Sequence, residues 1–278
     1  MASVIVPGVV EQLTPWVRRV TAPNPGVMTG PGTNAYIVGI DDLALIDPGP
    51  DIEAHQRALL AIVGTRLRWI LCTHTHTDHS PGARALKAAT GAQVIGRPTP
   101  LHGRQDATFA PDRVPENGDV INCGTFKLRV VHTPGHASNH LCYLLDQEKI
   151  LFTGDHVMQG STVVITPPDG DMVAYLRSLE ALLSLEMERI APGHGYLIDK
   201  PHDEARRLIA HRLKREQTVI DAFAAFNPGT VEELVSVAYS DTPLHLHPVA
   251  QRSLHSHLLK LEKEGRVAQR GERWSLLN

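Results

Sequence analysis

The run HTHTDH at residues 74–79 constrains the fold and chemistry of this chain more than any other segment. It places four potential metal ligands within six residues. The apolar segment 68–72 before it is predicted to be a buried strand. Beyond this strand the chain is expected to stay extended, so the side chains of His74 and His76 point to the same side. Both imidazoles can therefore reach one ion.

Asp78 and His79 follow where the chain is expected to turn into a helix near Pro81, since proline suits the first helical turn. Adjacent side chains at such a turn can diverge, which directs these two toward a second ion. Three later segments supply further ligands: His136 in TPGH, Asp155 in TGD and His194 in PGHG. The sequence thus predicts a centre that holds two ions of the zinc class.

The seven ligands divide into two sets that share one carboxylate. Zinc binds imidazole nitrogen and carboxylate oxygen in roughly tetrahedral geometry, and catalytic zinc keeps one position open for water. The first ion is assigned to His74, His76 and His136, the second to Asp78, His79 and His194, with Asp155 bridging the two. Two ions about 3.5–4 Å apart can share a hydroxide near neutral pH, so a bridging hydroxide is the predicted nucleophile. Iron and manganese also suit this ligand set.

Asp78 and His140 are the predicted catalytic residues. Loss of Asp78 is expected to abolish turnover. His140 starts a strand that leads toward the site, and two roles stay open for it. It is either the general acid that protonates the leaving group or a residue that holds a ligand in place.

These motifs make residues 1–200 resemble the metallo-β-lactamase superfamily. The resemblance rests on THTHTDH at 73–79, HTPGH at 132–136, FTGDH at 152–156, APGHG at 191–195 and the early LIDPG at 45–49. It implies an αββα sandwich, in which two facing sheets are flanked by helices and the metal loops gather at one edge. It also implies that Asp47 holds a ligand in orientation. The main clinical class of zinc β-lactamases has a cysteine near position 155, so Asp155 argues against antibiotic hydrolysis.

Other motifs resemble the β-lactamase-like endoribonuclease subgroup: GTNAY at 32–36, HSPGA at 79–83 and HLLKLEKEGRV at 257–267. This resemblance implies endonucleolytic cleavage of single-stranded RNA. Related thioesterases, including hydroxyacylglutathione hydrolase (glyoxalase II), imply the alternative, a small acyl ester, thioester or lactone. The metal motif cannot separate these substrates, because it reports the activation of water. Asn34 and Tyr36 are candidates for lining the pocket.

Strand-like and helix-like runs alternate along residues 1–200, as in layered α/β folds. The expected strands are 16–20, 35–40, 43–46, 69–72, 93–95, 126–131, 141–145 and 150–152, and the expected helices are 52–63, 81–89 and 172–185. Asp171 is the expected N-cap of the last helix. The chain is therefore expected to form an α/β catalytic domain over residues 1–200.

Residues 201–278 have a helical character and are expected to form a small winged-helix-like domain. The expected elements are helices at 202–226, 231–239 and 248–264 and a hairpin of 266–269 and 273–277. Thr230 is expected to cap the second of these helices. The charges disfavour DNA binding, because 11 Lys/Arg face 10 Asp/Glu in this domain. A lid over the active site, or an oligomer contact, is the expected role.

The composition suits an enzyme of the cytoplasm. The net charge of −3 gives no overall attraction to nucleic acid or to an anionic membrane. No apolar run reaches the roughly 18 residues of a membrane span, and the first residues lack the pattern of a secretory signal. Cys72, Cys123 and Cys142 lie in apolar segments and are expected to be free, buried thiols.

Overall fold

The computed structural model describes residues 4–277, and these divide into two compact units. The first unit contains the chain up to Thr133 together with Asn139–Ser161 and Leu185–Pro201. The second unit contains Pro134–Ser138, Thr162–Ser184 and the chain from His202 onward. Two short segments from within residues 1–200 thus belong to the second unit, and the expected domain boundary after residue 200 stays a prediction.

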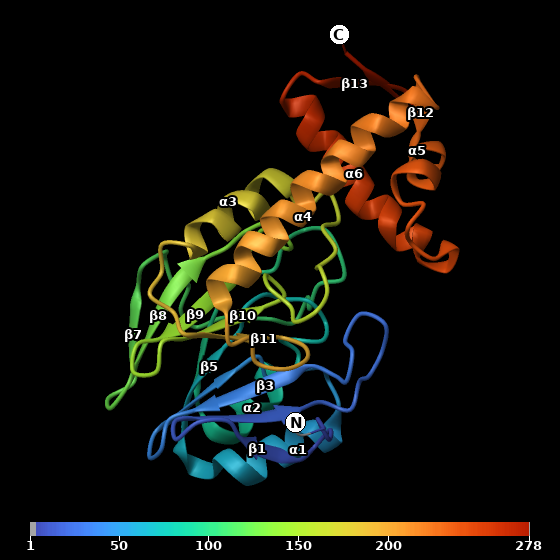
Figure 1. The fold of residues 1–278 in the computed structure, drawn as a ribbon. Coiled ribbons are helices and arrows are strands. Elements are labelled where there is room, and N and C mark those ends of the chain that lie inside the picture. The colour runs from blue at the N-terminus through green and yellow to red at the C-terminus, as the bar shows by residue number, and fades with distance from the viewer. Residues whose placement is uncertain (1–3, 278) are drawn as a thin grey trace. The chain divides into compact units, whose positions relative to one another are not determined.

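The first sheet of the first unit has six strands that follow one another in chain order (Figure 1). They are β1 (Val10–Gln12), β2 (Val17–Thr21), β3 (Asn34–Val38), β4 (Leu43–Ile46), β5 (Leu67–Leu71) and β6 (Gln93–Ile95). Neighbours are antiparallel up to β4, whereas β5 pairs in parallel with β4 and with β6. Parallel pairs need crossover connections. Helix α1 (Glu53–Val63), with the 3₁₀ turn Gly64–Arg66, makes one crossover, and helix α2 (Gly82–Thr90) makes the other.

The second sheet of the first unit has five strands in the order β11-β10-β9-β8-β7. Their bounds are β7 (Val120–Asn122), β8 (Lys127–His132), β9 (Leu141–Leu145), β10 (Ile150–Gly154) and β11 (Arg189–Pro192). Only β10 and β11 pair in parallel among these strands. The chain leaves β10 and β11 at the same end of the sheet, and both exits carry motifs that the sequence singles out.

An apolar core fills the space between the two sheets. Tyr36, Phe126, Tyr143 and Phe152 are its largest side chains, and each is at most 2% exposed. Side chains of this size contribute much of the hydrophobic stabilisation of a core. The two sheets therefore face each other, as the resemblance implies.

A second core lies on the other face of the first sheet, under helices α1 and α2. Successive side chains of a strand point to opposite faces, so Tyr36 and Val38 enter the core between the sheets while Ile37 packs with Leu59 of α1. Both faces are covered, and every residue of β3 is buried. Gly91, with a φ of 73°, ends α2 in the left-handed conformation that favours glycine.

The second unit contains helix α3 (Met172–Leu182), the 3₁₀ turns Ala222–Ala224 and Leu244–Leu246, and the C-terminal elements. These are α4 (Pro201–Asp221), β12 (Gly229–Thr230), α5 (Val231–Ala238), α6 (His247–Lys263), β13 (Val267–Arg270) and β14 (Arg273–Leu276). The side chain of Asp171 caps α3, and Thr230 forms a capping box with Glu233 at the start of α5. Leu254, Leu258 and Trp274 pack in the core beneath the hairpin.

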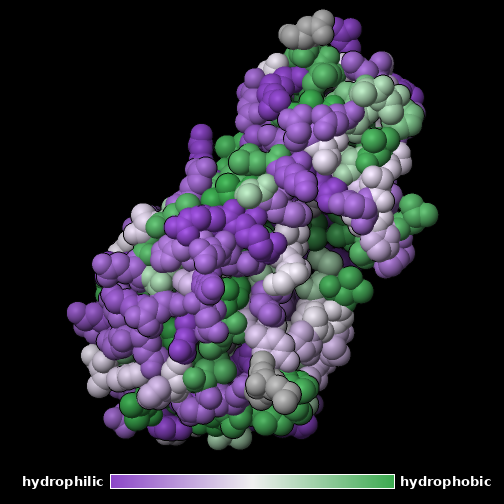
Figure 2. Space-filling model, in the orientation of Figure 1, coloured by the Kyte–Doolittle hydropathy of each residue, from purple (hydrophilic) through white to green (hydrophobic). Residues whose placement is uncertain are grey.

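The α/β class, the two facing sheets and the C-terminal winged helix are confirmed. Each expected strand and helix overlaps an observed one. The sequence does not predict β1, β7, β11 or β12, which have two to four residues each, because such short segments carry too little periodicity. Apolar residues are scattered among hydrophilic ones on the face that Figure 2 shows, as is ordinary for a protein surface. Over residues 4–277, no helix is both long and apolar enough to span a membrane.

Candidate metal centre

The metal motif lies in the loop between β5 and α2, residues 72–81, which we call the metal loop. Asp47, directly after β4, holds the start of this loop. Its carboxylate accepts hydrogen bonds from the backbone N of Thr73 at 2.7 Å and from the Thr73 hydroxyl at 2.8 Å. Asp47 has a φ of 52°, which is uncommon outside glycine. Because β4 and β5 are adjacent and parallel, Asp47 at the end of β4 lies beside the start of the metal loop, which follows β5.

One nitrogen of each histidine ring is engaged by the surrounding protein. Nδ1 of His79 lies 2.9 Å from the Asp47 carboxylate, Nδ1 of His194 lies 3.1 Å from the Gly32 carbonyl, and Nδ1 of His74 lies 3.0 Å from the Thr73 hydroxyl. Such contacts fix the tautomer and ring orientation of a metal-binding histidine. They leave Nε2 as the ligand atom of all three rings.

His76 presents its other nitrogen. Its Nδ1 lies 2.9 Å from Nε2 of His74, and the two ring planes are 83° apart. Two imidazoles whose ligand atoms face one point can bind one ion. His76 is thus placed to use Nδ1, while its neighbours in the motif use Nε2.

The ligand atoms of the first unit converge in two overlapping groups. One is His74, His79 and Asp155, and the other is Asp78, His79 and His194; within each group the atoms lie within 4.8 Å of one another. Nε2 of His79 is 3.4 Å from Asp155 Oδ1 and 3.6 Å from Asp78 Oδ2. Nε2 of His194 is 3.3 Å and 3.5 Å from the same two oxygens. Together with His76, six of the seven predicted ligands come together in this unit.

The carboxylates and imidazoles shift one another's protonation. Burial opposes the charged form of His194, but Asp155 and Asp78 outweigh it and raise the pKa of the imidazole to about 9. Burial likewise opposes the charged form of His79, and the neighbouring carboxylates hold its pKa well above the usual range. Burial would raise the pKa of Asp78, yet His79 and His194 lower it to about 2. The carboxylates are thus anionic and attract positive charge.

His74 is the exception among these histidines. Burial, followed by the neighbouring imidazoles of His79, His76 and His140, holds the pKa of His74 well below its usual range. A neutral imidazole is the form that binds metal. His74 is therefore ready for an ion at neutral pH.

A divalent cation fits these residues. Nε2 of His79 is buried and has no hydrogen-bond partner, and leaving a buried polar atom unpaired is costly. This nitrogen lies 3.4 Å from Asp155 Oδ1 and 3.6 Å from Asp78 Oδ2, distances beyond those of ordinary hydrogen bonds. A cation between them would satisfy the imidazole and neutralise the carboxylates.

His136 belongs to the second unit. Its Nδ1 lies 2.8 Å from the Val164 carbonyl, which leaves Nε2 as its ligand atom. Gly135 before it has a φ of 144°, and a Cβ there would lie 2.4 Å from Cα of Tyr175. Glycine is required where the backbone approaches so closely. The Val164 carbonyl thus orients the His136 imidazole through Nδ1, as the Gly32 carbonyl orients that of His194.

His140 is fully buried. Its Nδ1 lies 2.9 Å from the Thr133 hydroxyl, and its ring stacks on that of His74 with centroids 5.0 Å apart. This position suits a residue that holds His74 in place. The general-acid role of His140 stays a prediction.

Asn34 and Tyr36 do not line a pocket, because they are 0% and 2% exposed. They contact the PGHG loop, residues 192–195, which we call the His194 loop. The sequence singles out both residues but misplaces them. Successive side chains along β3 point to opposite faces, which directs Tyr36 into the core. This alternation is the sequence signal that could have indicated a buried role.

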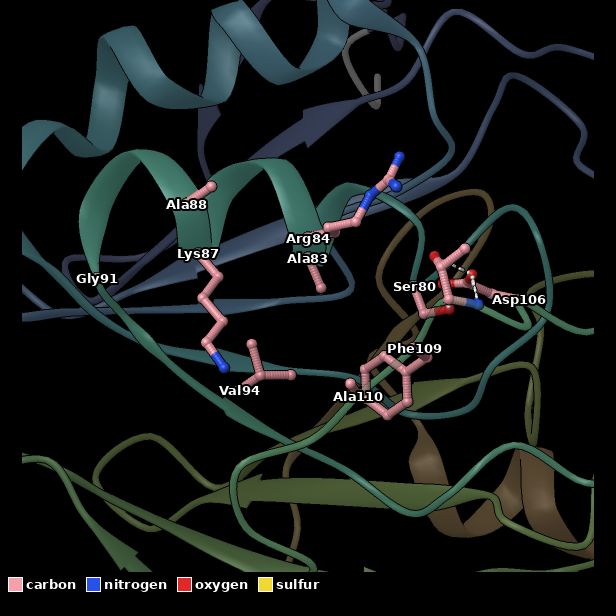
Figure 3. A pocket seen from close by; sticks show the side chains of 11 residues that line it. Ser80, Ala83, Arg84, Lys87, Ala88, Gly91, Val94, Asp106, Phe109 and Ala110 are labelled. Atoms are coloured by element: carbon pink, nitrogen blue, oxygen red, sulfur yellow. Dashed lines mark hydrogen bonds between the residues drawn. The ribbon is translucent and has the colours of Figure 1, made fainter.

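A cavity of about 390 Å³ lies along α2 (Figure 3). Ala83, Val94 and Phe109 are among its apolar lining residues, and none of the predicted ligands lines it. It reaches the metal loop only at Ser80, whose hydroxyl donates to Asp106 at 2.9 Å. The cavity is therefore separate from the metal centre.

Comparison with known proteins gives two family matches. The model of the metallo-beta-lactamase superfamily matches residues 28–194, and the model of the beta-lactamase associated winged helix domain matches residues 230–274. The first match contains all seven predicted ligands. The second lies within the C-terminal part of the second unit.

Similar proteins cover most of this chain. "Beta-lactamase-like protein 2 homolog" of Drosophila melanogaster is 34% identical, over 93% of this chain and 91% of the relative. "Atrochrysone carboxyl ACP thioesterase" of Aspergillus chevalieri is 32% identical, over 93% of this chain and 85% of the relative. A metallo-beta-lactamase family protein from Thermus thermophilus has a crystal structure that superposes with a TM-score of 0.77 at 24% identity, over 96% of this chain and 100% of that one. This last likeness shows the fold.

Proposed function

This chain belongs to the metallo-β-lactamase superfamily, whose members are hydrolases, and from that premise we propose that it hydrolyses acyl thioesters with two divalent ions. The observation that carries the proposal is the convergence of two carboxylates and four imidazoles in the first unit. Each of His74, His79 and His194 is oriented through Nδ1 by the protein around it. Such preparation is typical of a metal centre.

The ligand roles follow the sequence-based assignment. We propose that His74, His76 and His136 hold the first ion, and that Asp78, His79 and His194 hold the second. The two oxygens of Asp155 suit a bridging role, since Oδ1 lies near the imidazoles of both His79 and His194. His136, in the second unit, keeps its sequence-based assignment as the third ligand of the first ion.

The ions would supply an activated water and polarise the attacked carbonyl. The chain's own residues supply the rest. Asp47 and the Gly32 carbonyl keep two imidazoles in fixed orientation. We propose zinc as the resident ion, although iron and manganese suit the same ligands.

An acyl group is the substrate that the surroundings of the site favour. Val27 is 84% exposed and Met28 is 49% exposed. They lie on the loop before β3, and Thr33 of this loop forms a β-bridge with His194. Leu101 is 96% exposed. It lies on the loop after β6, and Gln105 of this loop forms a β-bridge with His76. Exposed apolar side chains on the loops beside His194 and His76 suit an acyl chain better than a phosphodiester backbone. Two relatives named as atrochrysone carboxyl ACP thioesterases support the same class.

Endonucleolytic cleavage of single-stranded RNA is the second candidate. It is favoured by the subgroup that the motifs at 32–36, 79–83 and 257–267 resemble. The net charge of −3 weakens it. An RNA substrate would require a local basic surface.

The test is to incubate the zinc-loaded protein with acyl thioesters and, separately, with labelled single-stranded RNA. We expect release of free thiol from the thioesters and intact RNA. RNA cleavage that disappears in Asp78→Ala, together with stable thioesters, would reverse the order of the two candidates. Loss of RNA binding with added salt would support phosphate contacts.

We also propose the cytoplasm as the site of action. Cys72, Cys123 and Cys142 are free and buried, as expected, which suits a reducing compartment. Fractionation of cells that express the tagged full-length chain tests this.

A further inference from the structure

We propose that Asn34 is a positioning residue that fixes the His194 loop and thereby sets the affinity of the second metal position. The inference rests on the proposed two-ion function, because it assigns Asn34 a task toward the ligand set of Asp78, His79 and His194. Asn34 is fully buried. It therefore acts through His194 and touches no substrate.

Asn34 holds the His194 loop on both sides of the histidine. Its carboxamide Nδ2 donates to the carbonyl of Pro192 at 3.1 Å and to the carbonyl of Gly195 at 2.9 Å. Its backbone N donates to the carbonyl of Gly193 at 2.8 Å. One residue thus engages three of the four carbonyls of this loop, and all three belong to residues beside or near the ligand.

Two neighbours extend this clamp. The Tyr36 hydroxyl donates to the Pro192 carbonyl at 2.7 Å, and Arg19 Nη1 donates to the Gly195 carbonyl at 2.8 Å. Both side chains are only 2% exposed. Each holds a carbonyl that Asn34 also holds, so Asn34 is the member common to both ends of the loop.

The loop needs such external support because glycine stands on each side of His194. A Cβ on Gly193 would lie 2.8 Å from Oδ1 of Asp155 and 2.8 Å from Cε1 of His79, so a side chain would disturb the ligands. Gly195 has a φ of 82°, which favours glycine. Glycine loses more conformational freedom on folding than other residues. The close approach to the proposed ligands requires glycine at position 193. Two glycines beside His194 make the loop easy to loosen.

Small movements of this loop matter for a metal ligand. Zinc–nitrogen bonds are about 2.0–2.1 Å long and tolerate little displacement. His194 has one further hold on its ring, the contact of Nδ1 with the Gly32 carbonyl. A loosened loop weakens the second position and leaves the first, because neither the three histidines proposed for the first ion nor the bridging Asp155 belongs to this loop.

The experiment measures zinc affinity at each position for the full-length chain, by competition with chelators of graded strength. For Asn34→Ala we expect one of the two ions to bind 10–100-fold less tightly, as for other residues that orient a ligand, and the affinity for the other ion to stay unchanged. Tyr36→Phe removes one of the paired donors to Pro192 and is expected to shift affinity in the same direction by less. It provides the test if Asn34→Ala does not fold.

Thr21→Val is the matched control. The Thr21 hydroxyl donates to Asn34 Oδ1 at 2.8 Å, whereas the bonds from Asn34 to the His194 loop come from Nδ2 and the backbone N. Its loss removes a buried hydrogen bond of similar kind, so melting temperature is expected to fall while both zinc affinities stay as in the wild type. A purely structural role for Asn34 would move both variants alike.

The outcomes are distinct from those of the proposed function, because no substrate is needed. Folded Asn34→Ala and Tyr36→Phe variants with unchanged affinity for both ions would overturn the inference. Equal weakening of both ions in Asn34→Ala would also overturn it. A wild-type chain that takes up a single ion would overturn this inference together with the two-ion function. Two ions bound without thioester hydrolysis would remove the substrate proposal and leave the role of Asn34 in place.

Discussion

Two largely buried clusters, one in each unit, both combine carboxylate and imidazole side chains but use them in different ways. The metal cluster consists of Asp78, His79, Asp155 and His194 in the first unit. Its nitrogen–oxygen distances of 3.3–3.6 Å exceed those of charge-assisted hydrogen bonds. The Glu216 cluster consists of Glu216, His257 and Lys260 in the second unit. There the Glu216 carboxylate accepts from Lys260 Nζ at 2.7 Å and lies 3.3 Å from Nδ1 of His257.

The protonation of the histidines differs between the clusters. In the metal cluster two carboxylates face His194 and raise its pKa to about 9. In the Glu216 cluster burial lowers the pKa of His257; the charges of Arg212 and Lys260 act in the same direction and the Glu216 carboxylate does not outweigh them. The Glu216 carboxylate is therefore neutralised within its own cluster. In the metal cluster the contacts between imidazoles and carboxylates are loose, and a cation that displaces the imidazole protons would bind both kinds of side chain.

Replacing Asp78 tests the metal cluster with the largest expected effect. Asp78→Ala removes a proposed ligand of the second ion, so we expect kcat/KM for thioesters to fall by more than the roughly 100-fold seen when a ligand's partner is removed. Asp112→Ala is the control, because Asp112 is an exposed carboxylate paired with Lys87. Thioester activity that survives in a folded Asp78→Ala variant would contradict the two-ion site.

Replacing Glu216 tests the second cluster. Glu216→Ala leaves Lys260 and His257 buried without their common partner, and breaking a buried pair in this way costs about 3 kcal/mol of unfolding free energy. Urea denaturation of the metal-loaded protein measures it, with the exposed Glu232→Ala as the control. A loss near that of an exposed pair, below about 1 kcal/mol, would show that the cluster is not effectively buried.

Replacing Asp47 sharpens the comparison, because Asp47 holds a ligand of the metal cluster without binding an ion itself. Asp47→Asn weakens the support of His79 Nδ1 and of the metal loop. We expect zinc affinity to fall 10–100-fold. Chelator competition measures this, and an affinity equal to that of the wild type would mean that the loop is held by other contacts.

The pH dependence of zinc binding tests the protonation of the metal cluster. His194 keeps a proton below its pKa of about 9 and must lose it to bind an ion. Zinc affinity is therefore expected to rise with pH up to that value, by about tenfold per pH unit for each displaced proton. Calorimetry in buffers of different ionisation enthalpy counts the protons, and binding at pH 7 without proton release would contradict this.

The Glu216 cluster gives the smallest expected effect, on stability. Burial opposes the charged form of Glu216, but His257 and Lys260 outweigh it and lower its pKa, so its contribution is lost as pH falls through the folded-state pKa. The pKa of His257 is lowered by burial, so the unfolded chain takes up a proton first and stability falls below about pH 6.5. Glu216 and His257 therefore both lower the stability of the folded chain as the pH falls. Melting temperatures that do not fall between pH 7 and pH 4, or fall equally in Glu216→Gln, would contradict it.

The sequence predicts the layered fold well, because buried strands such as β3 and β5 and capped helices such as α3 carry strong local signals. It does not predict β11, which is short and is defined by its pairing with β10. The ligands are predictable because the spacing of the metal motif reflects local geometry. Six of these candidates lie close together within the first unit, and their role as metal ligands stays a prediction.

What surrounds the ligands could not be predicted in the same way. The contacts of Asn34 with Pro192 and Gly195 join residues more than 150 positions apart. The choice of Nδ1 or Nε2 in each ring depends on carbonyls and hydroxyls that only the folded chain brings near. Such contacts produce no periodicity or fixed spacing in the sequence, so they cannot be predicted from a single sequence.

The most direct measurement titrates the metal-free protein with zinc while acyl-thioester hydrolysis is followed. The two-ion account predicts that activity rises to a plateau at two zinc ions per chain. Full activity at one ion per chain, or a protein that takes up none, would contradict it.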